Sequence, residues 1–160
     1  MRLTFRPALE KDISVICSFS QSEEELFFLF PKANFPLSIF SLQKAIAERS
    51  DASVVELNGE VVAFANFYQW GRDYCAIGNV IVSPSVRRRG VARYLIEQMI
   101  ELAFARHQTA EVRVSCFHQN VAGLLLYPKL GFKPYAIEER QDKKGNRVAL
   151  IHLRFVRGAS

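Results

Sequence analysis

One segment, from Cys75 to His107, restricts the possible folds more than any other part of the chain. Cys75–Val82 is nearly all apolar, which is typical of a strand buried on both faces, and Ser83-Pro84 ends it. A short loop then leads to a predicted helix with apolar residues at spacings of three and four, namely Ala92, Leu95, Ile96, Met99, Ile100 and Ala103. Because such a stripe has to pack on a sheet, the sequence predicts an α/β (α+β) fold.

The other predicted elements are short strands and helices on either side of this segment. Residues 53–57 and 60–70 are rich in β-branched and aromatic residues, and Asn58-Gly59 between them suits a tight hairpin turn. We also expect strands at residues 3–6, 111–116, 135–140 and 147–155, and helices at residues 13–20, 42–49 and 120–130. No repeat or linker-like stretch interrupts them, so we expect a single domain over residues 1–160.

The composition is that of an ordinary globular protein, with 49% hydrophobic and 23% charged residues. The first residues carry charges where a signal peptide needs an apolar stretch, and no window of about 18 uninterrupted apolar residues occurs. We therefore expect a cytoplasmic protein with no membrane partner. The three cysteines, Cys17, Cys75 and Cys116, are widely spaced and form no Cys-x-x-Cys pair, so we expect reduced, structural thiols and no metal site.

Positive charge is concentrated in the loop before the long predicted helix. The net charge is +5, and the only run of three basic residues is Arg87-Arg88-Arg89, directly before Gly90. The first turn of a helix has N–H groups without internal partners and carries partial positive charge, so it attracts phosphate. A charge run alone is more often a solvated loop, but the neighbouring Gly90 and Ala92 leave the backbone open, which favours a pyrophosphate site.

Two motifs in this order resemble the GNAT superfamily of acetyl-CoA-dependent N-acetyltransferases. Arg87, Gly90 and Ala92 match its Gln/Arg-x-x-Gly-x-Gly/Ala signature after the fourth strand. Residues 120–132 are similar to its Asn-x-x-Ala-x-x-Leu-Tyr-x-x-x-Gly-Phe segment. The resemblance implies a GNAT-like mixed, mostly antiparallel central sheet of about six or seven strands flanked by helices. It also implies that the fourth strand splays from the fifth to admit the pantetheine arm.

The resemblance further implies acetyl transfer to a primary amine by direct attack in a ternary complex, with acetyl-CoA as cosubstrate and without a metal. Backbone N–H groups of the fourth strand contact the acetyl and pantetheine portions in the family, and a tyrosine often protonates the leaving sulfur. The residues implied to bind the cofactor are Val80, Ile81, Val82, Arg87, Arg88, Arg89, Gly90, Val91, Ala92, Arg93, Asn120, Gly123 and Tyr127. Tyr127 is also the implied catalytic acid.

Several positions have a second interpretation. Tyr127 could be a half-buried aromatic residue on an amphipathic helix, and Asn120 could be an N-cap as well as a cofactor contact. Gly123 replaces the family's alanine, which lowers helix propensity but leaves room for the cofactor. Ser22-Glu23-Glu24-Glu25 could attract a cationic amine, although a capping box is the favoured interpretation.

The general base is not evident, because residues 74–82 contain no carboxylate, which many relatives have there. The three histidines, His107, His118 and His152, look isolated, and His118 lies nearest the second motif. Five phenylalanines are candidates for an acceptor pocket or for ordinary core: Phe27, Phe28, Phe30, Phe35 and Phe40.

Two other function classes remain at this point. The missing carboxylate permits a catalytically silent acyl-CoA-binding sensor. The basic residues permit nucleic-acid binding, which is disfavoured because they are not interleaved with stacking aromatic residues. We expect no nucleic-acid partner and a small-molecule or protein amine as acceptor; a homodimer is left open.

Overall fold

The computed structural model describes residues 2–158 and contains a seven-stranded sheet in the order β1-β2-β3-β4-β5-β7-β6. The strands are β1 (Leu3–Pro7), β2 (Ser50–Leu57), β3 (Glu60–Gln69), β4 (Cys75–Val82), β5 (Val112–Phe117), β6 (Lys133–Gln141) and β7 (Arg147–Phe155). All neighbouring pairs are antiparallel except β4 and β5, which are parallel. The predicted mixed, mostly antiparallel sheet is therefore confirmed.

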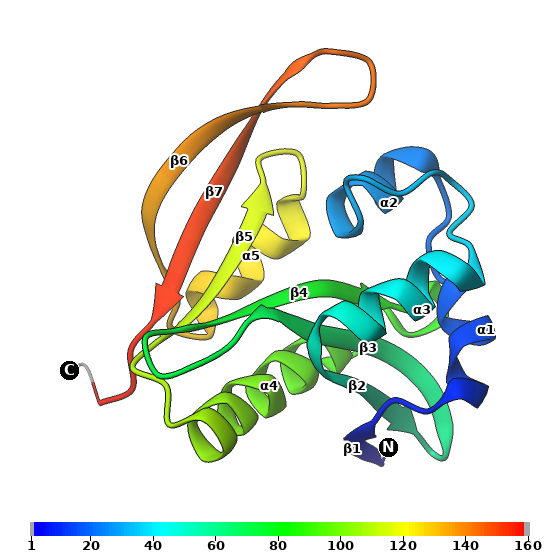
Figure 1. The fold of residues 1–160 in the computed structure, drawn as a ribbon, viewed down its shortest axis with the longest axis horizontal. Helices are drawn as coiled ribbons and strands as arrows, with labels where there is room; N and C mark the ends of the chain where they lie inside the picture. The colour runs from blue at the N-terminus through cyan, green and yellow to red at the C-terminus, as the bar shows by residue number, and fades with distance from the viewer. Residues whose placement is uncertain (1, 159–160) are drawn as a thin grey trace.

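Helices lie on both faces of this sheet (Figure 1). The α-helices are α1 (Ile13–Cys17), α2 (Glu23–Leu29), α3 (Ile39–Glu48), α4 (Val91–His107) and α5 (Val121–Lys129), with short 3₁₀ turns at Glu10–Asp12 and Pro84–Val86. The predicted helix over residues 13–20 is shorter in the structure: it ends at Cys17, with Ser18 as the C-cap, and a 3₁₀ turn precedes it. The helix expected at residues 42–49 begins earlier, at Ile39, because Ser38 caps it.

Two large apolar clusters fill the space between the helices and the two faces. On one face, the stripe of α4, including Leu95, Ile96 and Met99, packs on the sheet together with Tyr127 and Phe132 from α5 and its end. On the other face, α1 and α3 pack on Val54, Phe64 and Ile81. A smaller third cluster holds α2 against β5 and β7, and its Phe27 and Phe117 rings stack 4.6 Å apart.

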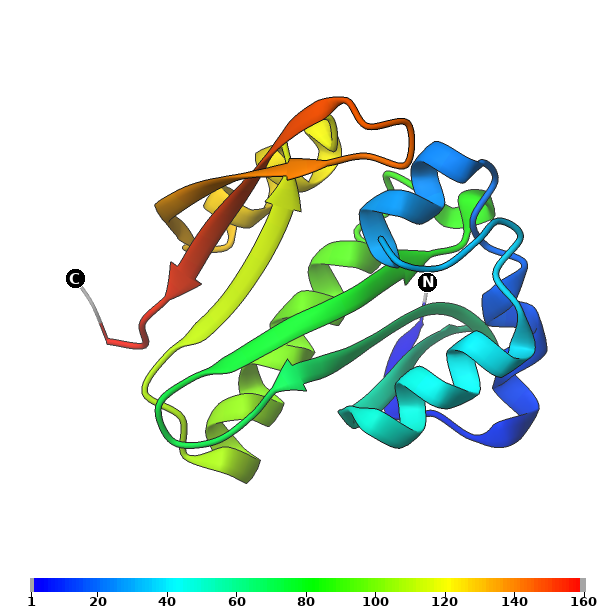
Figure 2. The same cartoon turned by 45° about the horizontal axis from the view of Figure 1, so that its top comes forward.

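The sheet opens in its middle, between β4 and β5. Only two residue pairs join these strands, Cys75↔Val112 and Ala76↔Arg113, both at the start of β4. Beyond them the strands diverge, and β5 continues with the β6–β7 hairpin toward α2 (Figure 2). This arrangement confirms the predicted splay. It also corrects the expectation that β4 is buried on both faces, because Val80 and Val82 are only half-buried beside the opening.

Candidate active site

A cavity of about 710 Å³ lies at the opening between β4 and β5. Its walls come from β4, from the loop and first turn of α4, from α5, and from α2. Eleven of the residues predicted to bind a cofactor line it: Val80, Val82, Arg87, Arg88, Gly90, Val91, Ala92, Arg93, Asn120, Gly123 and Tyr127. Two sequence segments, 80–93 and 120–127, therefore meet at one site.

The N-terminal end of α4 opens into this cavity without a cap. Gly90 is the N-cap residue, and no side chain accepts a hydrogen bond from the first turn. The first bond of the helix runs from the Tyr94 N–H to the Gly90 carbonyl at 3.0 Å. Within residues 2–158 the N–H groups of Val91, Ala92 and Arg93 have no acceptor. Three converging donors and the positive end of the helix dipole make this turn suitable for a phosphate.

The backbone before α4 is shaped so that side chains stay clear of these donors. Gly90 has φ +78°, and a Cβ atom there would meet nothing within 4 Å, so the space next to the turn is open. Arg88 also has a positive φ, of 65°. Left-handed backbone of this kind is disfavoured for most residues and favours glycine at position 90.

The arginines of the loop have different surroundings. Arg87 lines the cavity and forms an ion pair with Glu25 of α2, while Arg93 pairs with Glu97 at 3.5 Å. Arg88 also lines the cavity. Arg89 is exposed and is not among the residues that line the cavity, so its predicted contact with the cofactor stays a prediction.

A bulge in β4 brings polar groups to the cavity. The register passes from Phe64↔Ile81 to Asn66↔Gly78, so β4 has one more residue than β3 here, and Asn79 takes φ 50°. The buried Asn66 amide donates to Asn79 Oδ1 at 2.9 Å, and the Asn79 amide donates to the Leu29 carbonyl at 2.7 Å. These bonds hold α2, β3 and β4 together at the cavity wall.

The side chain of Ile81 lies outside the cavity lining, so its predicted contact with the cofactor stays a prediction. This side chain is 1% exposed and packs in the cluster on the α1 and α3 face, whereas Val80 and Val82 line the cavity. Ile81 differs from its two neighbours because successive side chains of a strand point to opposite faces of the sheet.

Helix α5 begins with a side-chain cap and packs tightly at Gly123. Asn120 Oδ1 accepts a hydrogen bond from the Gly123 N–H at 3.2 Å, so the N-cap interpretation of Asn120 is confirmed. A Cβ atom on Gly123 would lie 2.8 Å from Cys116 Sγ and 3.3 Å from the Tyr127 ring. The missing side chain therefore makes room for the Cys116 thiol, and Gly123 also lines the cavity, so its predicted contact with the cofactor stays a prediction.

Tyr127 is buried beneath the cavity and edge-on to Phe132, with ring centroids 5.7 Å apart. Within the described residues its hydroxyl has no hydrogen-bond partner, although the residue lines the cavity. Burial, with smaller contributions from Cys116 and Tyr68, raises the pKa of the phenol far above its ordinary value. Tyr127 therefore stays protonated throughout the neutral range and can act as a proton donor.

Helix α2 covers the cavity from the other side of the opening. Ser22 Oγ accepts from the Glu25 N–H at 3.1 Å, as the capping-box interpretation predicted, but the Glu25 carboxylate pairs with Arg87 instead of returning to the cap. Glu24 and Phe28 also line the cavity. Of the other phenylalanine candidates, Phe27 and Phe30 are core, and Phe35 and Phe40 are exposed.

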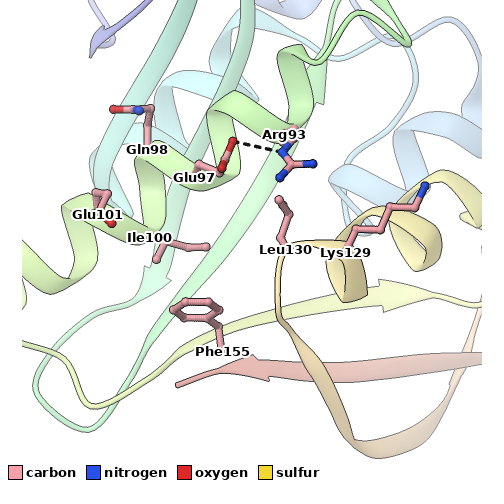
Figure 3. Close-up of a pocket in the computed structure, with 8 residues that line it drawn as sticks. All are labelled: Arg93, Glu97, Gln98, Ile100, Glu101, Lys129, Leu130 and Phe155. Carbon is pink, nitrogen blue, oxygen red and sulfur yellow. Dashed lines mark ion pairs between the residues drawn. The ribbon is translucent and has the colours of Figure 1, made fainter. Parts of the chain in front are cut away.

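A second, smaller hollow of about 430 Å³ lies on the outer side of α4, next to the end of α5 (Figure 3). It is lined by Arg93, Glu97, Gln98, Ile100, Glu101, Lys129, Leu130 and Phe155. Mid-helix N–H groups there are already bonded within α4, and carboxylates face the hollow. We therefore place the candidate site in the larger cavity, where unpaired donors and an opening in the sheet coincide.

Among residues 2–158, no helix combines the length and the apolar character needed to cross a membrane. No group of three or more His, Cys, Asp or Glu side chains in the same described range is placed to hold a metal ion. The three cysteines are free thiols.

Comparison with solved structures shows the same fold at low sequence identity. The ribosomal-protein-S18-alanine N-acetyltransferase from Escherichia coli is 22% identical, with a TM-score of 0.76 over 99% of this chain and 96% of that chain. The protein yncA from Salmonella typhimurium, solved with its cofactor acetyl-CoA, is 19% identical, with a TM-score of 0.77 over 100% of this chain and 96% of that chain. A chimera of spermidine N-acetyltransferase SpeG from Vibrio cholerae and hSSAT is 17% identical, with a TM-score of 0.79 over 98% of this chain and 96% of that chain.

No curated protein matches the sequence significantly. The family model described as the acetyltransferase (GNAT) family matches residues 17–132, which include β4, the uncapped turn of α4 and the motif of α5. The chain therefore belongs to the GNAT acetyltransferase family.

Proposed function

We propose that this protein transfers the acetyl group of acetyl-CoA to a primary amine by direct attack in a ternary complex. One observation carries the proposal: the unpaired N–H groups at the start of α4 and the Tyr127 side chain line the same cavity, at the opening between β4 and β5. This arrangement supports a proposed pyrophosphate site and a proposed proton donor on either side of one opening in the sheet.

The turn from Gly90 to Arg93 is proposed to hold the pyrophosphate of acetyl-CoA, with Arg88 and Arg93 adding positive charge. The half-buried Val80 and Val82 are proposed to flank the pantetheine arm and the acetyl group with their backbone. The cavity volume of about 710 Å³ lies in the range of ordinary small-molecule sites.

The chemistry requires a neutral amine and a protonated leaving group. The amine nitrogen forms a bond to the acetyl carbon, and the carbon–sulfur bond breaks with its electron pair on sulfur. We propose that the Tyr127 hydroxyl gives its proton to this thiolate and regains one from the new amide nitrogen. Burial that raises the pKa of Tyr127 weakens it as an acid, but the same burial makes a thiolate beside it more basic, so the transfer stays feasible.

The acceptor enters, in this proposal, past α2 and the β6–β7 hairpin. Glu24 lines the cavity there without an ion-pair partner among the described residues, and Phe28 offers an apolar contact. A carboxylate next to an apolar ring suits a cationic alkylamine. Ribosomal-protein alanine and spermidine are the acceptors named for two structural relatives, and both present such an amine.

A screen for coenzyme A thiol release tests the proposal. The protein is incubated with acetyl-CoA and with single members of four amine classes: amino acids, polyamines, aminoglycosides, and peptides with a free N-terminus or lysine. Thiol release that depends on one class, with an equal amount of acetylated amine by mass spectrometry, is the expected result. Tight acetyl-CoA binding without release for any class would instead favour a catalytically silent sensor, the alternative that the lack of a carboxylate on β4 permits.

A further inference from the structure

A chain of hydrogen-bonding side chains lies across the outer strands, beside the cavity. Ser115 of β5 faces His152 of β7 in the sheet register, and Ser115 Oγ lies 2.7 Å from His152 Nδ1. His152 Nε2 in turn lies 2.7 Å from Glu138 Oε1 of β6. The histidine that looks isolated in the sequence is therefore linked on both sides, whereas His118, which is nearer the motif, is exposed and only accepts from the Ala149 N–H.

The order of these contacts fixes the direction in which a proton can move. Arg140 and His152 hold the pKa of the Glu138 carboxyl below its usual range, so Glu138 is a carboxylate that only accepts hydrogen bonds. His152 Nε2 must then carry its proton toward Glu138, which leaves Nδ1 of the neutral ring free to accept. The only donor that faces Nδ1 in the described residues is the Ser115 hydroxyl.

The row of hydrogen-bonded side chains ends at Ser115, where the reaction needs a base. Ser115 lines the cavity, as Tyr127 and Val80 do, while the imidazole behind it is largely withdrawn from solvent, with 22% of its side chain exposed. The Tyr68 hydroxyl lies 3.5 Å from Ser115 Oγ, on the same side of the opening. β4 supplies no carboxylate, whereas Ser115 links the cavity to an imidazole, the side-chain type whose ordinary pKa lies near neutrality.

We propose that Ser115 and His152 form the proton relay that deprotonates the acceptor ammonium, with Glu138 as the positioning residue that orients the imidazole. This inference rests on the proposed function and adds to it the general base. An N–H bond of the ammonium breaks, and its electron pair stays on nitrogen. The proton goes to Ser115 Oγ as the serine proton passes to His152 Nδ1, and the imidazolium later releases a proton to water.

Groups on several strands surround this imidazole and set its charge balance. Glu138 favours the imidazolium, and the Tyr135 ring lies 6.1 Å from the His152 ring. Three arginines lie on the same strands: Arg140, bonded to Glu138, and Arg113 and Arg154, each 5.3 Å from the centre of the Tyr135 ring.

The pH profile of His152→Gln, with an alkylamine that the wild type accepts, tests the relay. At pH 7 only about one alkylamine molecule in a thousand is neutral, so loss of the base is expected to lower kcat/KM by about 10²-fold. The deficit is expected to shrink to a few-fold near pH 10, where the amine loses its proton to water. Ser115→Ala is expected to give the same converging profile.

Glu138→Gln provides a second test, because a purely structural role of Glu138 would not shift the pH profile. Removing the carboxylate disfavours the imidazolium, so the acidic limb of the kcat/KM profile is expected to shift to lower pH. Two matched controls are available: Glu139→Gln in the same hairpin, which removes the exposed pair with Arg147, and His118→Gln in the turn after β5. Both are expected to keep the wild-type profile.

The outcomes separate the relay from the proposed function. Wild-type turnover together with an unchanged profile in folded His152→Gln and Ser115→Ala overturns the relay and leaves the acetyltransferase intact. A loss that is equal at all pH values also overturns it, because it reports structure and not proton transfer. An inactive wild type with every amine overturns both proposals. A normal coenzyme A affinity and melting temperature show that each variant is folded.

Discussion

Gly90→Asp tests whether the first turn of α4 binds a phosphate. The wild-type residue has φ +78° and open space next to its Cα, so the new carboxylate enters the cavity beside the N–H groups of Val91 and Ala92. It then competes with the phosphate for those donors and repels it. The chain itself is expected to lose about 1–2 kcal/mol of unfolding free energy from the left-handed backbone.

The expected size of the binding effect follows from Coulomb's law. Two unit charges about 5 Å apart at an effective dielectric constant of about 20 repel each other by roughly 3 kcal/mol, and solvent at the rim reduces this to about 2 kcal/mol. The dissociation constant for coenzyme A is therefore expected to rise by about 30-fold. High salt is expected to reduce this loss.

Titration calorimetry with coenzyme A measures the effect, and two variants control for its causes. Gly90→Asn adds nearly the same volume and tolerates the same backbone, so the difference between Asp and Asn isolates the charge. Gly145→Asp places the same residue at φ +84° in the β6–β7 turn and is expected to leave the affinity unchanged. Equal affinities for folded Gly90→Asp, Gly90→Asn and wild type would refute the phosphate site.

Three further variants test the packing and chemistry around the site. Tyr127→Phe is expected to lower kcat about 10²-fold where chemistry limits the rate, with coenzyme A affinity unchanged, because only the proton donor is lost; an undiminished kcat assigns Tyr127 to packing. Gly123→Ala is expected to cost about 1–3 kcal/mol in urea unfolding despite better helix propensity, since its Cβ would lie 2.8 Å from Cys116 Sγ, and Cys116→Ala in the same chain is expected to recover part of the loss. Asp12→Asn is expected to cost about 1.5–3 kcal/mol at pH 7 through loss of the bonds from Arg6, at 2.8 and 2.9 Å. Because those bonds hold the folded pKa of Asp12 below its usual range, the unfolded state binds more protons, so this difference is present above about pH 4 and is lost as the pH falls through the folded pKa.

Local patterns in the sequence were sufficient for most elements of the fold. The strand Cys75–Val82 has the predicted bounds, and the apolar stripe of α4 packs on the sheet as expected, because hydrophobic periodicity reports which face is buried. The turn proposed to bind the pyrophosphate was also predicted, since Gly90 and the arginines are adjacent in sequence. The splay of β4 from β5 came from the resemblance to the family, and not from any local pattern.

The polar features of the site were missed because they depend on register between distant strands. Ser115 and His152 are 37 positions apart and meet only because β5 pairs with β7. The left-handed Asn79 in the β4 bulge follows Gly78, and this Gly-Asn pair inside an apolar run was the local signal that could have predicted a bulge. The close packing of Gly123 on Cys116 was missed for a related reason, because Cys116 belongs to another element.

A crystal structure of the protein with bound coenzyme A tests the central claim most directly. The account predicts the pyrophosphate within hydrogen-bond distance of the N–H groups of Val91, Ala92 and Arg93, and the sulfur between β4 and the Tyr127 hydroxyl, at the opening where β4 leaves β5. Coenzyme A bound in the smaller hollow on the outer side of α4, or a sulfur directed away from the opening, would contradict it.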